Sequence, residues 1–269
     1  MDPLEMFSRT KNRFWQKWSI AVKIIPFLAL VVGAKFLFHY KGWEIMEINA
    51  VFTSLVGGTI FLIGFLISGV LSDYKESEKL PSELAASLRT LNDDTDTLIR
   101  SFDSRAAREF AVYQKELYYA LINWFYKQER TQAMLHKISA MNEHISAIEK
   151  EGIQVNYIIR LKNEQNSIRK MLLRIDTVRD TNFIGPAYTI VEVMGLLIAF
   201  GLIIIKMDPF YASLFCTTLV TFLVAYMFLL IHDLDNPFDY SSKGESGTEV
   251  SLKSLNDLSE SIYATPDFL

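Results

Sequence analysis

The chain has 269 residues, of which 50% are hydrophobic and 22% are charged, and its formal net charge is −4. The hydrophobic fraction excludes a disordered chain, and the lack of a basic excess argues against general nucleic-acid binding. The single cysteine, Cys216, excludes a disulfide framework and a metal site made of several thiolates.

The first apolar segment, residues 18–40, is interrupted by Lys23 and Lys35. Long lysine side chains can extend toward the membrane surface, so this segment is predicted to span the membrane. A helix lying along the bilayer surface is the alternative.

The second apolar segment, residues 48–72, contains no charged residue and exceeds the roughly 20 residues that a helix needs to cross a bilayer. Spacings of three and four residues place a set of small, hydroxyl and benzyl side chains on one face of this helix. The set is Ser54, Gly57, Phe61, Phe65, Ser68 and Ser72. Small residues at this spacing allow close packing of helices, whereas a pore with a hydrophobic constriction is the alternative interpretation. A single helix cannot enclose a pore, so the second interpretation requires a symmetric oligomer.

The charged middle of the chain, residues 82–180, is predicted to form a helical bundle. Apolar residues recur at alternating spacings of four and three, which is typical of buried helix seams. The first seam is Met134, Ile138, Met141, Ile145 and Ile148; the second is Ile158, Leu161, Ile168, Leu172 and Ile175, with Gln165 in one seam position. A nucleic-acid platform of stacked aromatic residues is disfavoured because acidic and basic residues are balanced here.

The last two apolar segments are also predicted to span the membrane. Residues 209–231 contain no charge, and residues 187–205 contain only Glu192. A carboxylate in a membrane is costly unless it is paired, so we predict that Glu192 pairs with Lys23. An ion or proton site at Glu192 is the alternative. The segment after residue 241 is rich in Ser, Gly and Glu and is expected to be mobile.

These elements predict an all-α integral membrane protein with four transmembrane helices and a cytoplasmic helical bundle. Basic residues favour the cytoplasmic side, and they are concentrated before residue 18, so both termini are predicted to be cytoplasmic. The predicted divisions are an N-terminal cytoplasmic segment 1–17, a transmembrane hairpin 18–72, a cytoplasmic domain 73–185, a second hairpin 186–232 and a cytoplasmic tail 233–269. The sequence leaves open which cellular membrane holds the protein.

The sequence offers no catalytic constellation, so we do not expect an enzyme. The four histidines are His39, His136, His144 and His232, and none of them forms the i, i+4 pair of a helical zinc site. No side chains suggest a nucleophile next to a base.

Three short blocks of sequence carry a family resemblance. They are residues 64–74, a Gly-Phe pair in an apolar helix that leads to the Glu-Lys-Leu-Pro turn at 78–81; residues 163–169 followed by Gly-Pro-Ala-Tyr-Thr at 185–189; and Asp-Asn-Pro-Phe-Asp at 235–239. These blocks resemble the corresponding segments of bestrophins. Their order and the four-span layout agree with that family over about residues 10–240.

The resemblance implies a pentameric ion channel with one central pore. It places the apolar rings of the pore neck at Phe61 and Phe65, with Gly57 at a third ring position where the family has a bulkier residue. Ser54, Ser68 and Ser72 would then line the pore ends, and Ile184 or Gly185 would form a cytoplasmic aperture.

The preferred ion is a separate question, because the neck carries no charge. The family conducts mostly anions, while bacterial members can favour cations. Asp73 in the lumen would favour cations, and Arg9, Lys11 and Arg13 there would favour anions. Our interpretation favours anions such as chloride, with a cation-conducting channel of the same architecture as the alternative.

We expect no required cofactor. Calcium, which eukaryotic bestrophins bind through an acidic run after Asn-Pro-Phe, is a remaining alternative, with Asp235 and Asp239 as its candidate ligands. Calcium usually takes six to eight oxygens, and few carboxylates surround this motif. The expected partners are further copies of the chain, membrane lipid and small inorganic ions, but not nucleic acid. A membrane-anchored scaffold and a transporter that uses Glu192 as a proton relay are the competing functions.

Overall fold

The computed structural model describes residues 3–180, 185–240 and 249–263, with the backbone alone for residues 3–17 and 263. The regular secondary structure of these residues is helical, apart from one pair of two-residue strands. They divide into two compact units. The transmembrane unit comprises residues up to 74 and residues 185–236, and the bundle unit comprises residues 75–180, 237–240 and 249–263.

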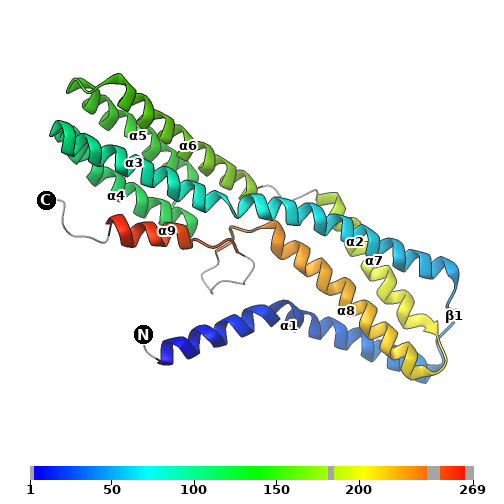
Figure 1. The fold of residues 1–269 in the computed structure, drawn as a ribbon. Coiled ribbons are helices and arrows are strands. Elements are labelled where there is room, and N and C mark those ends of the chain that lie inside the picture. The colour runs from blue at the N-terminus through cyan, green and yellow to red at the C-terminus, as the bar shows by residue number, and fades with distance from the viewer. Residues whose placement is uncertain (1–2, 181–184, 241–248, 264–269) are drawn as a thin grey trace. The chain divides into compact units, whose positions relative to one another are not determined.

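The transmembrane unit contains four helices that are long and apolar enough to cross a membrane. They are α1 (Pro3–Lys41), α2 (Ala50–Ser77), α7 (Gly185–Ile204) and α8 (Phe210–Asp235). Helix α8 lies beside both α1 and α7 (Figure 1). Two short strands, β1 (Met46–Glu47) and β2 (Ile205–Lys206), pair in parallel and join the loops at one end of the unit. The predicted all-α membrane fold is confirmed.

One side of α2 is buried against α7 and α8. The α2 residues Ile63, Leu66 and Val70 form a core cluster with Val191, Val224 and Ile231. Nearer the β1–β2 pair, Phe52 of α2 packs with Ile198, Leu202 and Ile205. Burial of these branched and aromatic side chains therefore fixes which face of α2 turns toward the rest of the transmembrane unit.

A close approach between α2 and α7 depends on Gly201. A β-carbon added to Gly201 would lie 2.3 Å from Cε2 of the Phe52 ring, so the ring would have to move. We expect Gly201→Ala to reduce the stability of the unit by about 1–3 kcal/mol, which is the usual cost of overpacking. Thermal unfolding in detergent measures this effect. Gly33→Ala is the matched control, because a β-carbon there meets nothing within 4 Å; equal unfolding temperatures for both variants would contradict the prediction.

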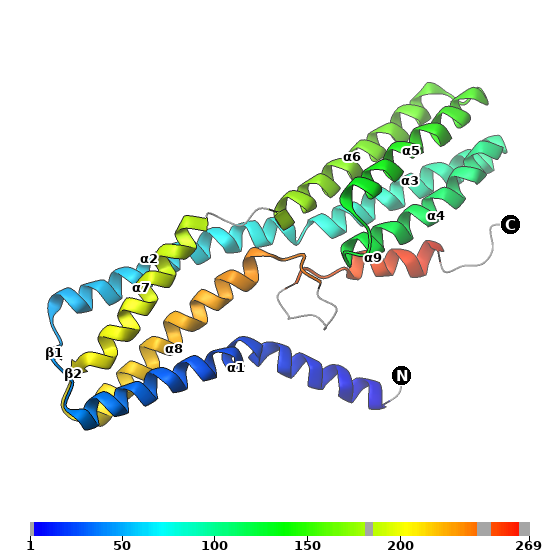
Figure 2. The ribbon, with the colours of Figure 1, turned by 180° about the vertical axis from the view of Figure 1, so that it is seen from behind.

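The bundle unit is built from four helices that pack in a ring (Figure 2). They are α3 (Leu80–Phe102), α4 (Arg105–Phe125), α5 (Thr131–Lys150) and α6 (Val155–Asp180). All the predicted seam residues of α5 and α6 are buried. Gln165 is buried too, and its amide donates a 2.6 Å hydrogen bond to the carbonyl of Ile138, which explains how the seam accepts a polar residue.

Part of the segment that we expected to be mobile is ordered. Residues 253–258 form α9 (Lys253–Leu258), followed by the π-helical turn η1 (Ser259–Tyr263). Leu252, Leu255 and Leu258 are buried, and the Tyr118 hydroxyl donates to the carbonyl of Leu255 at 3.0 Å. The expectation of mobility was wrong for this stretch because its leucines recur every three residues and bury against the bundle.

Candidate functional site

One face of α2 stays exposed in the single chain, opposite the buried face. The side chains along it are the ones that the sequence places together: Ser54, Gly57, Phe61, Phe65, Ser68 and Ser72, all of them exposed. Phe61 is 77% exposed and Phe65 is 68% exposed, although each is a large apolar side chain. A β-carbon on Gly57 would meet nothing within 4 Å. The single chain therefore leaves this face of α2 free to contact another molecule or water.

The exposed row of α2 is more polar than a helix face that contacts lipid tails usually is. Helix α8 presents a mostly apolar exposed row made of Tyr211, Phe215, Leu219 and Leu223, whose single hydroxyl is that of Tyr211 at the start of the helix. The α2 row instead has serine hydroxyls at both ends and two benzyl groups between them. Hydroxyls in a row that meets only hydrocarbon would lose their hydrogen bonds to water, so the α2 row suits a surface with wet ends.

An ionic cluster around the buried Lys35 joins three segments of the transmembrane unit near the β1–β2 pair. The Lys35 side chain is 0% exposed, and its Nζ lies 2.7 Å from Oε1 of Glu44. The same ammonium donates to the carbonyl of Ile203 at 3.4 Å and to the carbonyl of Ile205. His39 Nδ1 lies 2.9 Å from the second oxygen of Glu44.

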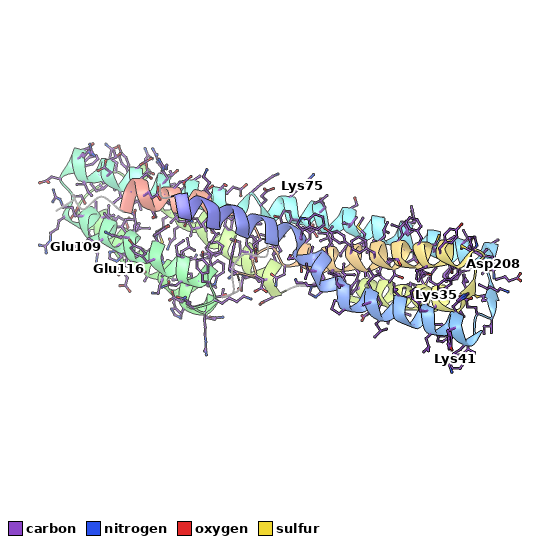
Figure 3. All side chains as sticks on the ribbon, turned by 90° about the horizontal axis from the view of Figure 1, so that it is seen from below. Lys35, Lys41, Lys75, Glu109, Glu116 and Asp208 are labelled. Atoms are coloured by element: carbon purple, nitrogen blue, oxygen red, sulfur yellow. The ribbon has the colours of Figure 1, made fainter. Side chains whose placement is uncertain are left out.

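This cluster lies at the same end of the helices as Lys41 and Asp208 (Figure 3). Burial alone would raise the pKa of Glu44, but the hydrogen bonds from Lys35 and His39 outweigh it and hold this pKa below its usual value. The sequence did not predict the Lys35–Glu44–His39 cluster, because Lys35 was expected to extend its side chain toward the membrane surface. The sequence pattern that could have predicted this cluster is Lys35 within an apolar segment, followed by Glu44 just after the end of α1.

The predicted pair between Lys23 and Glu192 is wrong. Lys23 Nζ lies 3.9 Å from a carboxylate oxygen of Asp233, because α1 packs beside α8. Glu192 is exposed on α7 and forms no ion pair among the residues that the structure describes. Lys23, near the middle of α1, thus reaches a carboxylate in the last turn of α8.

The predicted cytoplasmic aperture is only partly described. Ile184 lies outside the described residues. Gly185 is the first residue of α7 and is exposed, and a β-carbon there would meet nothing within 4 Å.

The Asn-Pro-Phe motif has a structural role in the bundle unit. Phe238 is completely buried, with its ring centroid 6.4 Å from that of Phe125. Asp239, a candidate calcium ligand, lies 2.5 Å from Lys127 Nζ. The other candidate, Asp235, ends α8 in the transmembrane unit. In the described part of the chain, no group of three or more His, Cys, Asp or Glu residues is placed to hold a metal ion.

Comparison with solved structures shows where this fold occurs. A bacterial bestrophin homologue from Klebsiella pneumoniae, in one mutant form, matches with a TM-score of 0.72 and 17% identity, over 91% of this chain and 98% of that chain. Another mutant form of the same homologue matches with a TM-score of 0.72 and 18% identity, over 89% of this chain and 97% of that chain. A search of curated proteins finds no match.

The family comparison covers most of the chain. The family model described as a Bestrophin-like domain matches residues 24–241. This range includes the whole four-helix bundle and all four apolar helices, except for the first part of α1. The chain belongs to the bestrophin-like family.

Proposed function

We propose that the chain forms a homo-oligomeric channel that conducts small ions passively, with anions such as chloride preferred. The observation that carries this proposal is the exposed row on α2, in which Phe61 and Phe65 project from the subunit between serine-bearing ends. Family membership and the fold shared with bacterial bestrophin homologues support it.

In the proposed assembly, α2 helices from a pentamer surround one axis and turn the row of exposed residues toward it. Ser54 and Ser72 are 18 residues apart, which corresponds to about 27 Å along a helix. Phe61 and Phe65 lie one helical turn apart, so they would form two adjacent apolar rings in the middle of that length. A narrow apolar ring excludes water when it closes, and this dewetting stops ions. Gly57 has no side chain, so the neck would have two rings instead of three.

We also propose the orientation in the membrane. The basic N-terminal segment, the bundle unit and the C-terminal tail would lie in the cytoplasm, in accord with the distribution of lysine and arginine. The ionic cluster of Lys35, His39 and Glu44 would then lie at the outer surface. In this orientation, residues 1–17, 73–185 and 233–269 would be cytoplasmic, and residues 18–72 and 186–232 would form the two transmembrane hairpins.

Planar-bilayer recording of the purified protein tests the proposal. We expect discrete unitary currents in symmetric chloride solutions, from a species whose mass in detergent is that of a homo-oligomer. A monomeric species without currents across salts and voltages would overturn the proposal and favour a membrane-anchored scaffold. Protein heated until it unfolds, then reconstituted in the same way, controls for currents from contaminants.

A further inference from the structure

Helix α1 is longer than a membrane crossing requires. It has 39 residues, whereas about 20 residues span the apolar part of a bilayer. Lys23 and Lys41 are 18 residues apart, which corresponds to about 27 Å of helix and nearly matches that thickness. Lys23 also pairs with Asp233 in the last turn of α8, where the apolar part of α8 ends. The part of α1 before Lys23 is therefore not needed for the crossing.

Helix α1 also changes direction partway along its length (Figures 1 and 2). Pro26 lies inside the helix, and a proline cannot donate the hydrogen bond to the carbonyl four residues earlier, which here is that of Val22. The bend that results lets the N-terminal part of α1 run in a different direction from the part that crosses the membrane.

The first residues of this helix have an amphipathic pattern. We call residues 3–18 the N-terminal arm. At about 100° per residue, the large apolar residues of the arm all fall within about 100° of the helix circumference. They are Leu4, Phe7, Phe14, Trp15 and Trp18. The opposite side takes only polar and charged residues, which are Glu5, Arg9, Asn12, Arg13 and Gln16. Such a narrow apolar side is typical of a helix that lies along a membrane surface.

The charge of the arm indicates which kind of membrane surface it fits. Four basic residues, Arg9, Lys11, Arg13 and Lys17, face one acidic residue, Glu5, in the same stretch. By register, Lys17 borders the apolar side and Lys11 falls within it, and a long lysine side chain can extend from there to a phosphate group. Basic residues next to the end of a membrane span attract anionic lipids, and tryptophan favours the headgroup level.

We propose that the N-terminal arm lies on the membrane surface and binds anionic lipid headgroups. The apolar side would enter the boundary between headgroups and acyl chains, and the lysines beside it would contact lipid phosphates. This inference goes beyond ion conduction, and it uses the proposed orientation only to assign the arm to the inner leaflet.

Fluorescent labels on opposite sides of the arm test the proposal. In a Cys216→Ala background, the whole protein would carry a nitrobenzoxadiazole label at Phe14→Cys or, as the matched control, at Gln16→Cys. These positions are about 200° apart around the helix. In nanodiscs of phosphatidylcholine and phosphatidylglycerol, lipid brominated on its acyl chains should quench the label at position 14 and spare the label at position 16. Without phosphatidylglycerol, quenching at position 14 should fall.

Equal quenching at both positions, or quenching at position 14 that does not depend on phosphatidylglycerol, would overturn the proposal. An absence of quenching at both positions would also overturn it, and would indicate that the arm contacts protein instead. These measurements need no ion conduction, so their failure is distinct from failure of the proposed function, in which the protein gives no current.

A charge substitution tests the headgroup contact separately. Lys17→Gln should lower the equilibrium constant for docking of the arm about fivefold, as expected for one basic residue near an anionic surface. Lys17→Arg should keep it. Arg9→Gln removes a charge from the side away from the lipid, about one screening length from the headgroups, and should have the smaller effect. A larger effect of Arg9→Gln than of Lys17→Gln would contradict the proposed face of contact.

Discussion

Replacing Phe65 by alanine is expected to raise the open probability of the channel about tenfold, the change that about 1.4 kcal/mol of gating free energy produces. In the proposed assembly this substitution removes one complete apolar ring from the neck, so the remaining constriction is wider and easier for water to enter. Phe61→Ala should act in the same direction, and the double variant should have the larger effect. Single-channel recording measures both the open probability and the unitary conductance.

Phe215→Ala provides the matched control for this prediction. Phe215 is 65% exposed on α8, close to the 68% of Phe65 on α2, but it belongs to the mostly apolar row of α8. Its substitution should leave both the open probability and the conductance unchanged. If Phe65→Ala channels behaved like wild type while Phe215→Ala channels changed, the α2 row would not line the pore.

Substitution of Glu44 by alanine is expected to destabilise the transmembrane unit by about 3–5 kcal/mol, the usual cost of leaving one buried charge without its partner. The Lys35 side chain is 0% exposed, so water cannot replace the lost carboxylate without rearrangement of the unit. The lysine would keep only the carbonyls of Ile203 and Ile205 as partners. Denaturant or thermal unfolding in detergent measures the change.

A double variant separates the lost pairing from simple loss of side-chain volume. Lys35→Met combined with Glu44→Gln removes both charges, so it should recover part of the stability lost in Glu44→Ala. Lys41→Ala removes an exposed charge at the same end of α1 and should change stability little. A double variant that is less stable than Glu44→Ala would contradict the account of the cluster.

The cluster also predicts how stability depends on pH. The hydrogen bonds from Lys35 and His39 hold the pKa of Glu44 below its usual 4.5 in the folded protein. A carboxylate with a depressed folded pKa stabilises the fold fully above its unfolded pKa, and this contribution is lost as the pH falls through the folded value. Wild-type protein should therefore lose stability below about pH 4.5. Glu44→Gln should lack that part of the pH dependence.

Periodicity was enough to predict the elements whose faces repeat along one helix. The long apolar segments predicted the spans, and the spacings of four and three predicted the buried seams of α5 and α6. The same spacings placed Phe61 and Phe65 on one exposed face. Each of these features depends on residues within a few turns of each other, so the sequence contains the whole signal.

Contacts between residues far apart in the sequence could not be predicted from periodicity. Lys35 is held partly by backbone carbonyls of Ile203 and Ile205, which any sequence would supply. The partner of Lys23 depends on which helix packs beside α1, and span lengths do not reveal that. The role of Phe238 as a buried anchor beside Phe125 likewise depends on tertiary packing.

Thiol modification at position 65 tests most directly whether α2 lines a shared aqueous axis. In a Cys216→Ala background, Phe65→Cys channels would be treated with a charged, water-soluble methanethiosulfonate reagent while current is recorded. A reagent that abolishes the current through Phe65→Cys and spares that through Phe215→Cys is the result we predict. Unchanged current through Phe65→Cys, after mass spectrometry has shown that its thiol is modified, would contradict the pore assignment.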